Sequence, residues 1–171
     1  MRRTQFGIPC TNYRANTMKF LVIGALGSMG QRRTRCLKQL GHEVTEWDII
    51  HKTEMPRDNF DGIIISTPPD KHEQYMCNLG YPTFVEASVL PYKCYSNVYP
   101  SCTMRFHPIV NEIKDALRNT KPLHFIHYVG NYLPHWHPKE DYKEKYFAKK
   151  LTGGAREIVA FENEWLSWVF G

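Results

Sequence analysis

The stretch that decides the fold is FLVIGALGSMGQRR, residues 20–33, in which an apolar run breaks into three glycines and then becomes helical. Residues 18–24 are short, apolar and closed by a glycine, which is typical of a strand buried on both faces. The helix that follows places Cys36 and Leu40 on its expected inner face, and a second strand is predicted over residues 42–49. A strand, a helix and a strand within about 30 residues predict a βαβ unit.

The same alternation continues along the chain. Further strands are predicted over residues 60–69, 82–88 and 97–104, and further helices over residues 70–80 and 107–119. Pro100 has no N–H to donate, so the strand that contains it is expected at an edge of the sheet. The pattern predicts an α/β protein, with a Rossmann-like doubly wound parallel sheet covered by helices on both faces.

The pattern changes after residue 120. Residues 122–133 look like a strand, residues 138–151 are polar and partly helical, and residues 153–171 form a final helix rich in large aromatic side chains. A lone strand and a lone helix cannot bury their own apolar surface. We therefore expect residues 122–171 to pack on the first domain or on a partner, as a homodimer or a heteromeric complex.

Composition narrows the class of protein. The chain has 171 residues and a net charge of +5, but its basic residues are interleaved with acidic ones, so no nucleic-acid interface is predicted. No apolar run approaches the ~20 residues that cross a bilayer, so no membrane span is predicted. The five cysteines lack the spacing of metal ligands. We expect no metal site, reduced thiols and a cytoplasmic location.

Gly24, Gly27 and Gly30 form a G-x-x-G-x-x-G motif, one residue longer in its first gap than the common dinucleotide fingerprint. In that fingerprint the first glycine permits a tight turn, the second lets the backbone approach a pyrophosphate, and the third lets helix and strand pack closely. The free backbone N–H groups of the first helical turn and the positive end of the helix dipole then face the phosphates.

Asp48 supports a dinucleotide because it ends the second strand roughly 20 residues after the glycines, where a carboxylate accepts hydrogen bonds from the adenosine ribose. A carboxylate there repels a 2′-phosphate, so NAD is favoured. His51 and Lys52 follow and soften that preference, which leaves NADP open. A glycine-rich turn that binds no cofactor is the remaining alternative.

Four ordered motifs, VIGALGSMGQRR, DGIIISTPPDKHEQY, FVEAS and MRFHPIV, resemble the Gfo/Idh/MocA oxidoreductases, as does the C-terminal stretch GNYLPHWHPKEDYKEKYFAKKLTGGAREIVAFENEWLSWVFG. The resemblance is to a branch associated with surface polysaccharide and nucleotide-sugar metabolism. It implies a dinucleotide-binding Rossmann domain (18–120) and the truncated start of a C-terminal α+β substrate and dimerisation domain (121–171). Residues 1–17, which lack acidic residues and an apolar run, are expected to form a disordered extension.

The resemblance also implies a set of cofactor-binding positions. They are Gly24, Ala25, Leu26, Gly27, Ser28, Met29, Gly30, Asp48, Thr67, Pro68, Pro69, His72 and Glu86. The segment that holds Thr67 to His72 is expected to pass beneath the nicotinamide side of the cofactor.

The catalytic positions depart from the family pattern. Ala87 stands where the family has its lysine, and Phe161 stands where it has its histidine, and neither side chain transfers protons. Lys93, His135 and His137 are weak replacements. Three hypotheses follow: an NAD(P)-dependent oxidoreductase acting on a sugar-like or sugar-nucleotide-like substrate, a catalytically degenerate dinucleotide-binding protein, and a structural module without a ligand.

Overall fold

The computed structural model describes residues 16–76, 80–86, 96–120, 124–130, 132–136, 138–152 and 154–171. Within these residues five parallel strands form one sheet in the order β2-β1-β3-β4-β5. The strands are β1 (Lys19–Ile23), β2 (Glu43–Trp47), β3 (Gly62–Ile65), β4 (Thr83–Val85) and β5 (Val98–Pro100). The predicted α/β class and open parallel sheet are confirmed.

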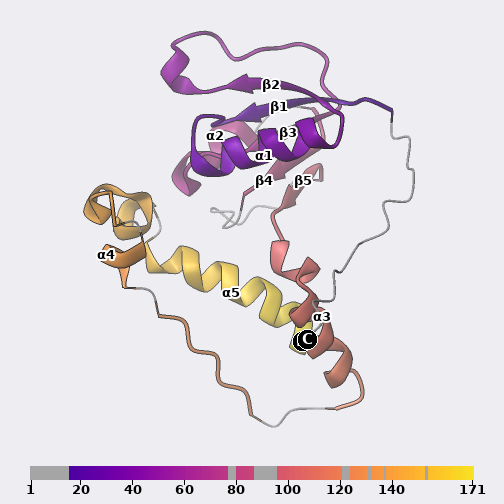
Figure 1. The fold of residues 1–171 in the computed structure, drawn as a ribbon, viewed down its shortest axis with the longest axis vertical. Helices are drawn as coiled ribbons and strands as arrows, with labels where there is room; N and C mark the ends of the chain where they lie inside the picture. Colours follow the sequence, from indigo (N-terminus) through magenta and orange to yellow (C-terminus); the bar gives the residue numbers. More distant parts are fainter. Residues whose placement is uncertain are drawn as a thin grey trace, which may run out of the picture.

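The sheet is buried on both faces, as its apolar strands predict. Leu21 and Ile23 of β1 belong to one core cluster, which includes Met76 of α2 (His72–Met76). Val22 belongs to the other, where Leu37 of α1 (Ser28–Gln39) packs against it. Because successive side chains of a strand point to opposite faces, α1 and α2 cover opposite sides of the sheet (Figure 1).

The inner face of α1 differs from the predicted one. Cys36 is exposed and Leu40 is 71% exposed, whereas the buried residues of the helix are Gly30 and Thr34. Small residues face the sheet because the start of α1 lies almost against the end of β1. Farther along the helix Leu37, which has the same predicted helical spacing, does pack against the sheet.

At one edge of the sheet the strand predicted over residues 97–104 is shorter, because only Val98–Pro100 form β5 and Thr103–Phe106 form the 3-10 turn η3. β5 is the edge strand, and Pro100 pairs with Val85 there, as expected for a proline. The predicted helix over residues 70–80 begins as the 3-10 turn η2 (Pro69–Lys71) and continues as α2. Residues 77–79, near the end of this predicted helix, lie outside the described residues. Residues 1–15 also lie outside them, so the extension predicted over residues 1–17 stays a prediction.

The C-terminal elements form a layer beside the sheet, where Figure 1 shows α5 running from the short α4 towards α3. These helices are α3 (Pro108–Leu117), α4 (Leu133–Trp136) and α5 (Ala155–Phe170). Helix α3 contacts α5, where Nζ of Lys114 lies 3.6 Å from the ring centroid of Trp168. The predicted final helix is therefore confirmed and packs on α3.

The strand predicted over residues 122–133 is not part of the sheet. Residues 124–130 have no regular secondary structure, and Leu133 already begins α4. The segment between α4 and α5, residues 138–152, holds three 3-10 turns: η4 (Tyr142–Glu144), η5 (Tyr146–Ala148) and η6 (Lys150–Thr152). Its predicted partly helical character is confirmed in this short form.

No helix in the described part of the chain is long and apolar enough to cross a membrane.

Candidate functional site

The strand order places a candidate site at the carboxyl ends of β1 and β3. β1 has β2 on one side and β3 on the other, so the chain changes direction across the sheet at this point. Ligands of open α/β sheets bind in the crevice outside such a switch point. The glycine turn leaves β1 here, and residues 66–69 leave β3 here. A Cβ at Gly24 would lie only 2.9 Å from the carbonyl carbon of Ser66, so the two loops touch.

Gly24 is required by its own conformation. Its φ of +79° lies in the left-handed region, which side chains rarely adopt. The amides of Gly24 and Ala25 both donate to the carbonyl oxygen of Trp47, at 2.9 and 3.2 Å, and this fixes the turn to the end of β2. The amide of Gly27 then donates to the Gly24 oxygen at 3.2 Å. The extra residue of the motif is accommodated in this hydrogen-bonded four-residue turn.

Gly30 is required by packing between helix and strand. A Cβ at this position would lie 2.1 Å from the Gly24 carbonyl oxygen and 2.8 Å from Cα of Ala25. Real Cβ atoms do not approach backbone atoms so closely. The helix therefore starts directly against the turn, as the third glycine of a dinucleotide fingerprint allows.

Gly27 differs from the other two because nothing in the protein's own packing requires it. It is exposed, its φ is −68°, and a Cβ would meet the Gly24 oxygen at an ordinary 3.4 Å. Gly27 is also the N-cap of α1, and no side chain caps this end of the helix. Free N–H groups at an uncapped helix start, beneath a residue without a side chain, suit a phosphate.

Asp48 lies beside the turn and fixes it. Its two carboxylate oxygens accept hydrogen bonds from the amides of Leu26 at 3.2 Å and Ile50 at 3.3 Å. The residue is 8% exposed, while Leu26, His51 and Lys52 around it are exposed. Each carboxylate oxygen has a second lone pair. Asp48 therefore joins the glycine turn to the end of β2 and retains acceptor capacity towards a ribose.

The loop after β3 is held by a hydrogen bond from the side chain of His72. This side chain is fully buried, and its Nε2 lies 2.8 Å from the carbonyl oxygen of Thr67. A carbonyl only accepts, so Nε2 carries the hydrogen. His72 thus positions the backbone of Thr67 and does not reach the surface. In the same loop Pro68 is exposed and Pro69 is buried. In the described residues the buried hydroxyls of Ser66 and Thr67 have no hydrogen-bond partner.

Glu86 ends β4 and forms an ion pair with Arg33 of α1, a residue that the sequence prediction missed. Arg33 also reaches the hydroxyl of Ser101 at 3.3 Å and lies over the ring of Phe84, 5.0 Å from its centroid. The hydrogen bond to Glu86 raises the pKa of Arg33 above its ordinary value. Glu86 therefore ties β4 to α1, and its position in sequence gave no sign of this partner.

The charge of the same carboxylate acts on a tyrosine of the C-terminal segment. Burial raises the pKa of Tyr146, and the negative charges of Glu157 and Glu86 raise it further. Glu157 is buried in the first turn of α5. The 3-10 turn η6 contacts η2, which follows the loop after β3. These contacts bring Tyr146 to the carboxyl side of the sheet, and no local sequence signal indicates it.

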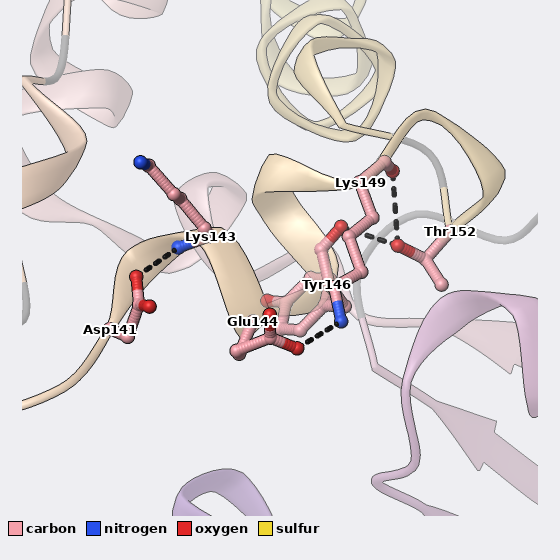
Figure 2. A network of polar contacts seen from close by, with 6 residues as sticks. All are labelled: Asp141, Lys143, Glu144, Tyr146, Lys149 and Thr152. Carbon is pink, nitrogen blue, oxygen red and sulfur yellow. Dashed lines mark hydrogen bonds and ion pairs between the residues drawn. The ribbon is translucent and has the colours of Figure 1, made fainter.

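The backbone around Tyr146 is held by the polar network in Figure 2. The hydroxyl of Thr152 donates to the carbonyl oxygens of Tyr146 and Lys149. Lys149 forms an ion pair with Glu144 at 2.8 Å, and a carboxylate oxygen of Asp141 caps η4 by accepting from the amide of Lys143 at 3.0 Å. Local contacts thus set the conformation of η4, η5 and η6 before they meet the sheet.

The weak catalytic candidates gain no support from the structure. Ala87, Lys93 and His137 lie outside the described residues. His135 is exposed in α4, where its ring packs on Tyr132 at a centroid distance of 4.8 Å. Phe161 is half-buried in α5. Among the described residues no group of three or more His, Cys, Asp or Glu side chains is arranged to hold a metal ion.

Comparison with known proteins adds no family assignment. No family model, no curated protein and no solved structure matches the chain. The Gfo/Idh/MocA resemblance therefore stays a prediction from the sequence motifs.

Proposed function

We propose that this chain binds a dinucleotide at the switch point of its sheet, with NAD preferred and NADP not excluded. The observation that carries the proposal is the difference between the three glycines of the turn. Gly24 and Gly30 are required by conformation and packing, whereas Gly27 is exposed at an uncapped helix start with room for a side chain. A glycine is useful there when another molecule approaches the backbone closely.

The described residues would divide the work as follows. The turn from Gly24 to Gly30 would hold the pyrophosphate through backbone N–H groups, and Asp48 would accept hydrogen bonds from the ribose hydroxyls. Thr67 and Pro68, on the loop supported by His72, would border the nicotinamide half. The bound cofactor would supply hydride transfer at its nicotinamide ring.

We further propose that the chain is an NAD(P)-dependent oxidoreductase of the Gfo/Idh/MocA type, acting on a sugar-like or sugar-nucleotide-like substrate in the cytoplasm. Hydride transfer to or from a hydroxyl-bearing carbon needs a group that moves the hydroxyl proton. The family lysine position is Ala87. Tyr146, a phenol whose pKa is raised by burial and by two carboxylates, stays protonated and would donate its proton to the substrate oxygen when a carbonyl is reduced.

A catalytically degenerate dinucleotide-binding protein is the second candidate. Two substitutions favour it, because Ala87 and Phe161 stand at positions where the family resemblance implies a lysine and a histidine. Such a protein would keep the turn and Asp48 and lose turnover. It would act as a sensor, a regulatory subunit or a remnant.

Calorimetric titration of the full chain with NADH and with NADPH tests the binding step. We expect saturable heat with NADH and weaker binding of NADPH. If neither dinucleotide gives heat at millimolar concentration, both candidate functions fail and a structural module without a ligand remains.

Turnover separates the two candidates. Nicotinamide absorbance is followed with a panel of sugars and nucleotide sugars, using wild-type chain, Tyr146→Phe, and the double variant Ala87→Lys/Phe161→His. Turnover by the wild type that Tyr146→Phe abolishes without loss of NADH affinity supports the oxidoreductase. NADH binding without turnover, and turnover gained by the double variant, supports the degenerate protein.

A further inference from the structure

Residues 124–130 belong to no sheet, but the rings of Phe125 and His127 lie on the same side of the chain, as those of residues two apart do in extended backbone. The rings of Phe125 and His127 are stacked, with centroids 6.2 Å apart and planes inclined by 7°. Residues i and i+2 of a strand point to the same side and are separated by about 6.6 Å. The segment is therefore extended, with Phe125 and His127 on one side and Ile126 and Tyr128 on the other.

One side of this segment is fastened to α5. The ring centroid of Phe125 lies 4.2 Å from that of Phe170, and the ring of His127 lies 5.3 Å from that of Trp165. Nε2 of His127 is 2.9 Å from a carboxylate oxygen of Glu162, which also accepts from the indole N–H of Trp165 at 2.7 Å. These contacts hold the segment in one orientation along the helix.

The other side and the backbone are free. Ile126 is 79% exposed and Tyr128 is 89% exposed, against 46% for Phe125 and 39% for Val129 on the α5 side. In the described part of the chain, the backbone N–H and C=O groups of residues 124–130 form no backbone hydrogen bonds. An extended segment with unpaired backbone groups and an apolar outer face is a template for another strand.

This segment lacks the features that protect exposed strands from pairing. Edge strands of monomeric proteins carry charged side chains, prolines or bulges that discourage a second strand. Residues 122–138 contain no Asp, Glu, Lys or Arg, and residues 124–130 contain no proline. The chain as a whole carries a net charge of +5, so this is a place where two copies can approach without like-charge repulsion.

We propose that residues 124–130 of two copies pair as antiparallel strands about a twofold axis at His127. This register sets Ile126 of one copy opposite Tyr128 of the other, and Phe125 opposite Val129. Both kinds of pair join an aromatic and a β-branched residue, which is a favourable cross-strand combination. A twofold axis requires such a self-complementary surface. The proposal is independent of cofactor binding, because it uses neither the glycine turn nor Asp48.

Sedimentation of the full chain at tens of micromolar tests the dimer. We expect a dimer for the wild type and at least a tenfold weaker association for Ile126→Lys/Tyr128→Lys, because the register places the new charges opposite each other. The matched control, Leu40→Lys/Ile109→Lys, also replaces two exposed apolar residues and should leave the dimer intact. A monomeric wild type overturns the proposal, also when it associates only with a different protein. A dimer that persists in Ile126→Lys/Tyr128→Lys overturns it as well.

Cysteine cross-linking and hydrogen exchange test the register and the backbone contacts. A mixture of the single variants Ile126→Cys and Tyr128→Cys should form a disulfide-linked heterodimer in larger amount than either variant alone or the wild type. Amide exchange at residues 124–130 of the wild type should slow as protein concentration rises through the dimer range. Equal cross-linking in all samples, or exchange at these amides that is independent of concentration, contradicts strand pairing.

Discussion

At the scale of single residues, the three glycines of one turn have three different reasons to be there. Gly24 adopts a left-handed conformation, and Gly30 lies against the Gly24 carbonyl. Gly27 has neither constraint. Gly24 and Gly30 are therefore required by the fold, whereas Gly27 is the glycine whose role we assign to ligand binding.

Gly30→Ala should therefore destabilise the fold, by about 1–3 kcal/mol, because its methyl group would overlap backbone atoms that cannot move without separating α1 from β1. Gly27→Ala should leave stability unchanged. Denaturant unfolding of both variants measures the difference. Equal loss of stability in the two variants would show that Gly27 is also a packing residue.

Asp48 decides which dinucleotide is preferred. Asp48→Asn keeps an acceptor for only one of the two amides, Leu26 or Ile50, and removes the charge that repels a 2′-phosphate, so the preference for NADH over NADPH should fall roughly tenfold. The measurement is the ratio of the two dissociation constants. Lys52→Gln, a change at an exposed neighbour, serves as the control and should shift the ratio in the opposite direction. An unchanged ratio in Asp48→Asn would remove Asp48 from the site.

At the scale of elements, the sheet was predictable and the attachments between elements were not. The strands could be predicted because β1 and β3 are short apolar runs bounded by glycine and proline, which few other structures accommodate. The inner face of α1 was mispredicted because its contact distance is set by Gly30, which a count of apolar residues does not detect. The glycines of the turn and Asp48 were proposed as cofactor-binding residues from their spacing, and Thr67, Pro68, Pro69, His72 and Glu86 from the family resemblance. Arg33 and Tyr146 were missed because their partners, Glu86 and Glu157, are distant in sequence.

Tyr146, in the 3-10 turn η5, should make the stability of the protein depend on pH in the alkaline range. The pKa of Tyr146 is raised above its ordinary value of 10.0, so above this pH the folded chain holds a proton that the unfolded chain has lost. The free energy of unfolding then falls as pH rises through the window from the ordinary pKa to the raised one. Tyr146→Phe should flatten this fall. Stability of both chains measured from pH 8 to 11 checks it, and parallel curves would contradict a raised pKa at Tyr146.

The contact between α3 and α5 includes a cation over an aromatic ring. Nζ of Lys114 lies over the ring of Trp168 and donates to its carbonyl oxygen at 2.6 Å. Lys114→Met retains most of the aliphatic stem and removes both interactions, which should cost about 1–2 kcal/mol. Denaturant unfolding gives the cost. Arg118→Met, at an exposed ion pair within α3, should cost about 0–1 kcal/mol, and the same loss in both variants would argue against the Trp168 contact.

At the scale of the whole molecule, the two proposed surfaces lie apart. Figure 1 shows α5 between the sheet and the segment that leads from α3 to α4. The dinucleotide site is on the sheet side of this helix, and the proposed strand pairing is on the other. Ile126→Lys/Tyr128→Lys should therefore bind NADH within about twofold of the wild type, well under the 1.4 kcal/mol that a tenfold change represents. A larger loss, measured by calorimetry, would show that dimerisation completes the site.

The central claim is that the turn after β1 holds a dinucleotide through the backbone around Gly27. Calorimetric titration of NADH into the wild type and into Gly27→Ala, side by side, tests it most directly. We expect saturable binding by the wild type and a loss of roughly ten- to a hundredfold in Gly27→Ala, since the methyl group would keep the phosphates from the amides, with unfolding curves that coincide. Equal affinity for NADH in the two folded proteins would contradict it.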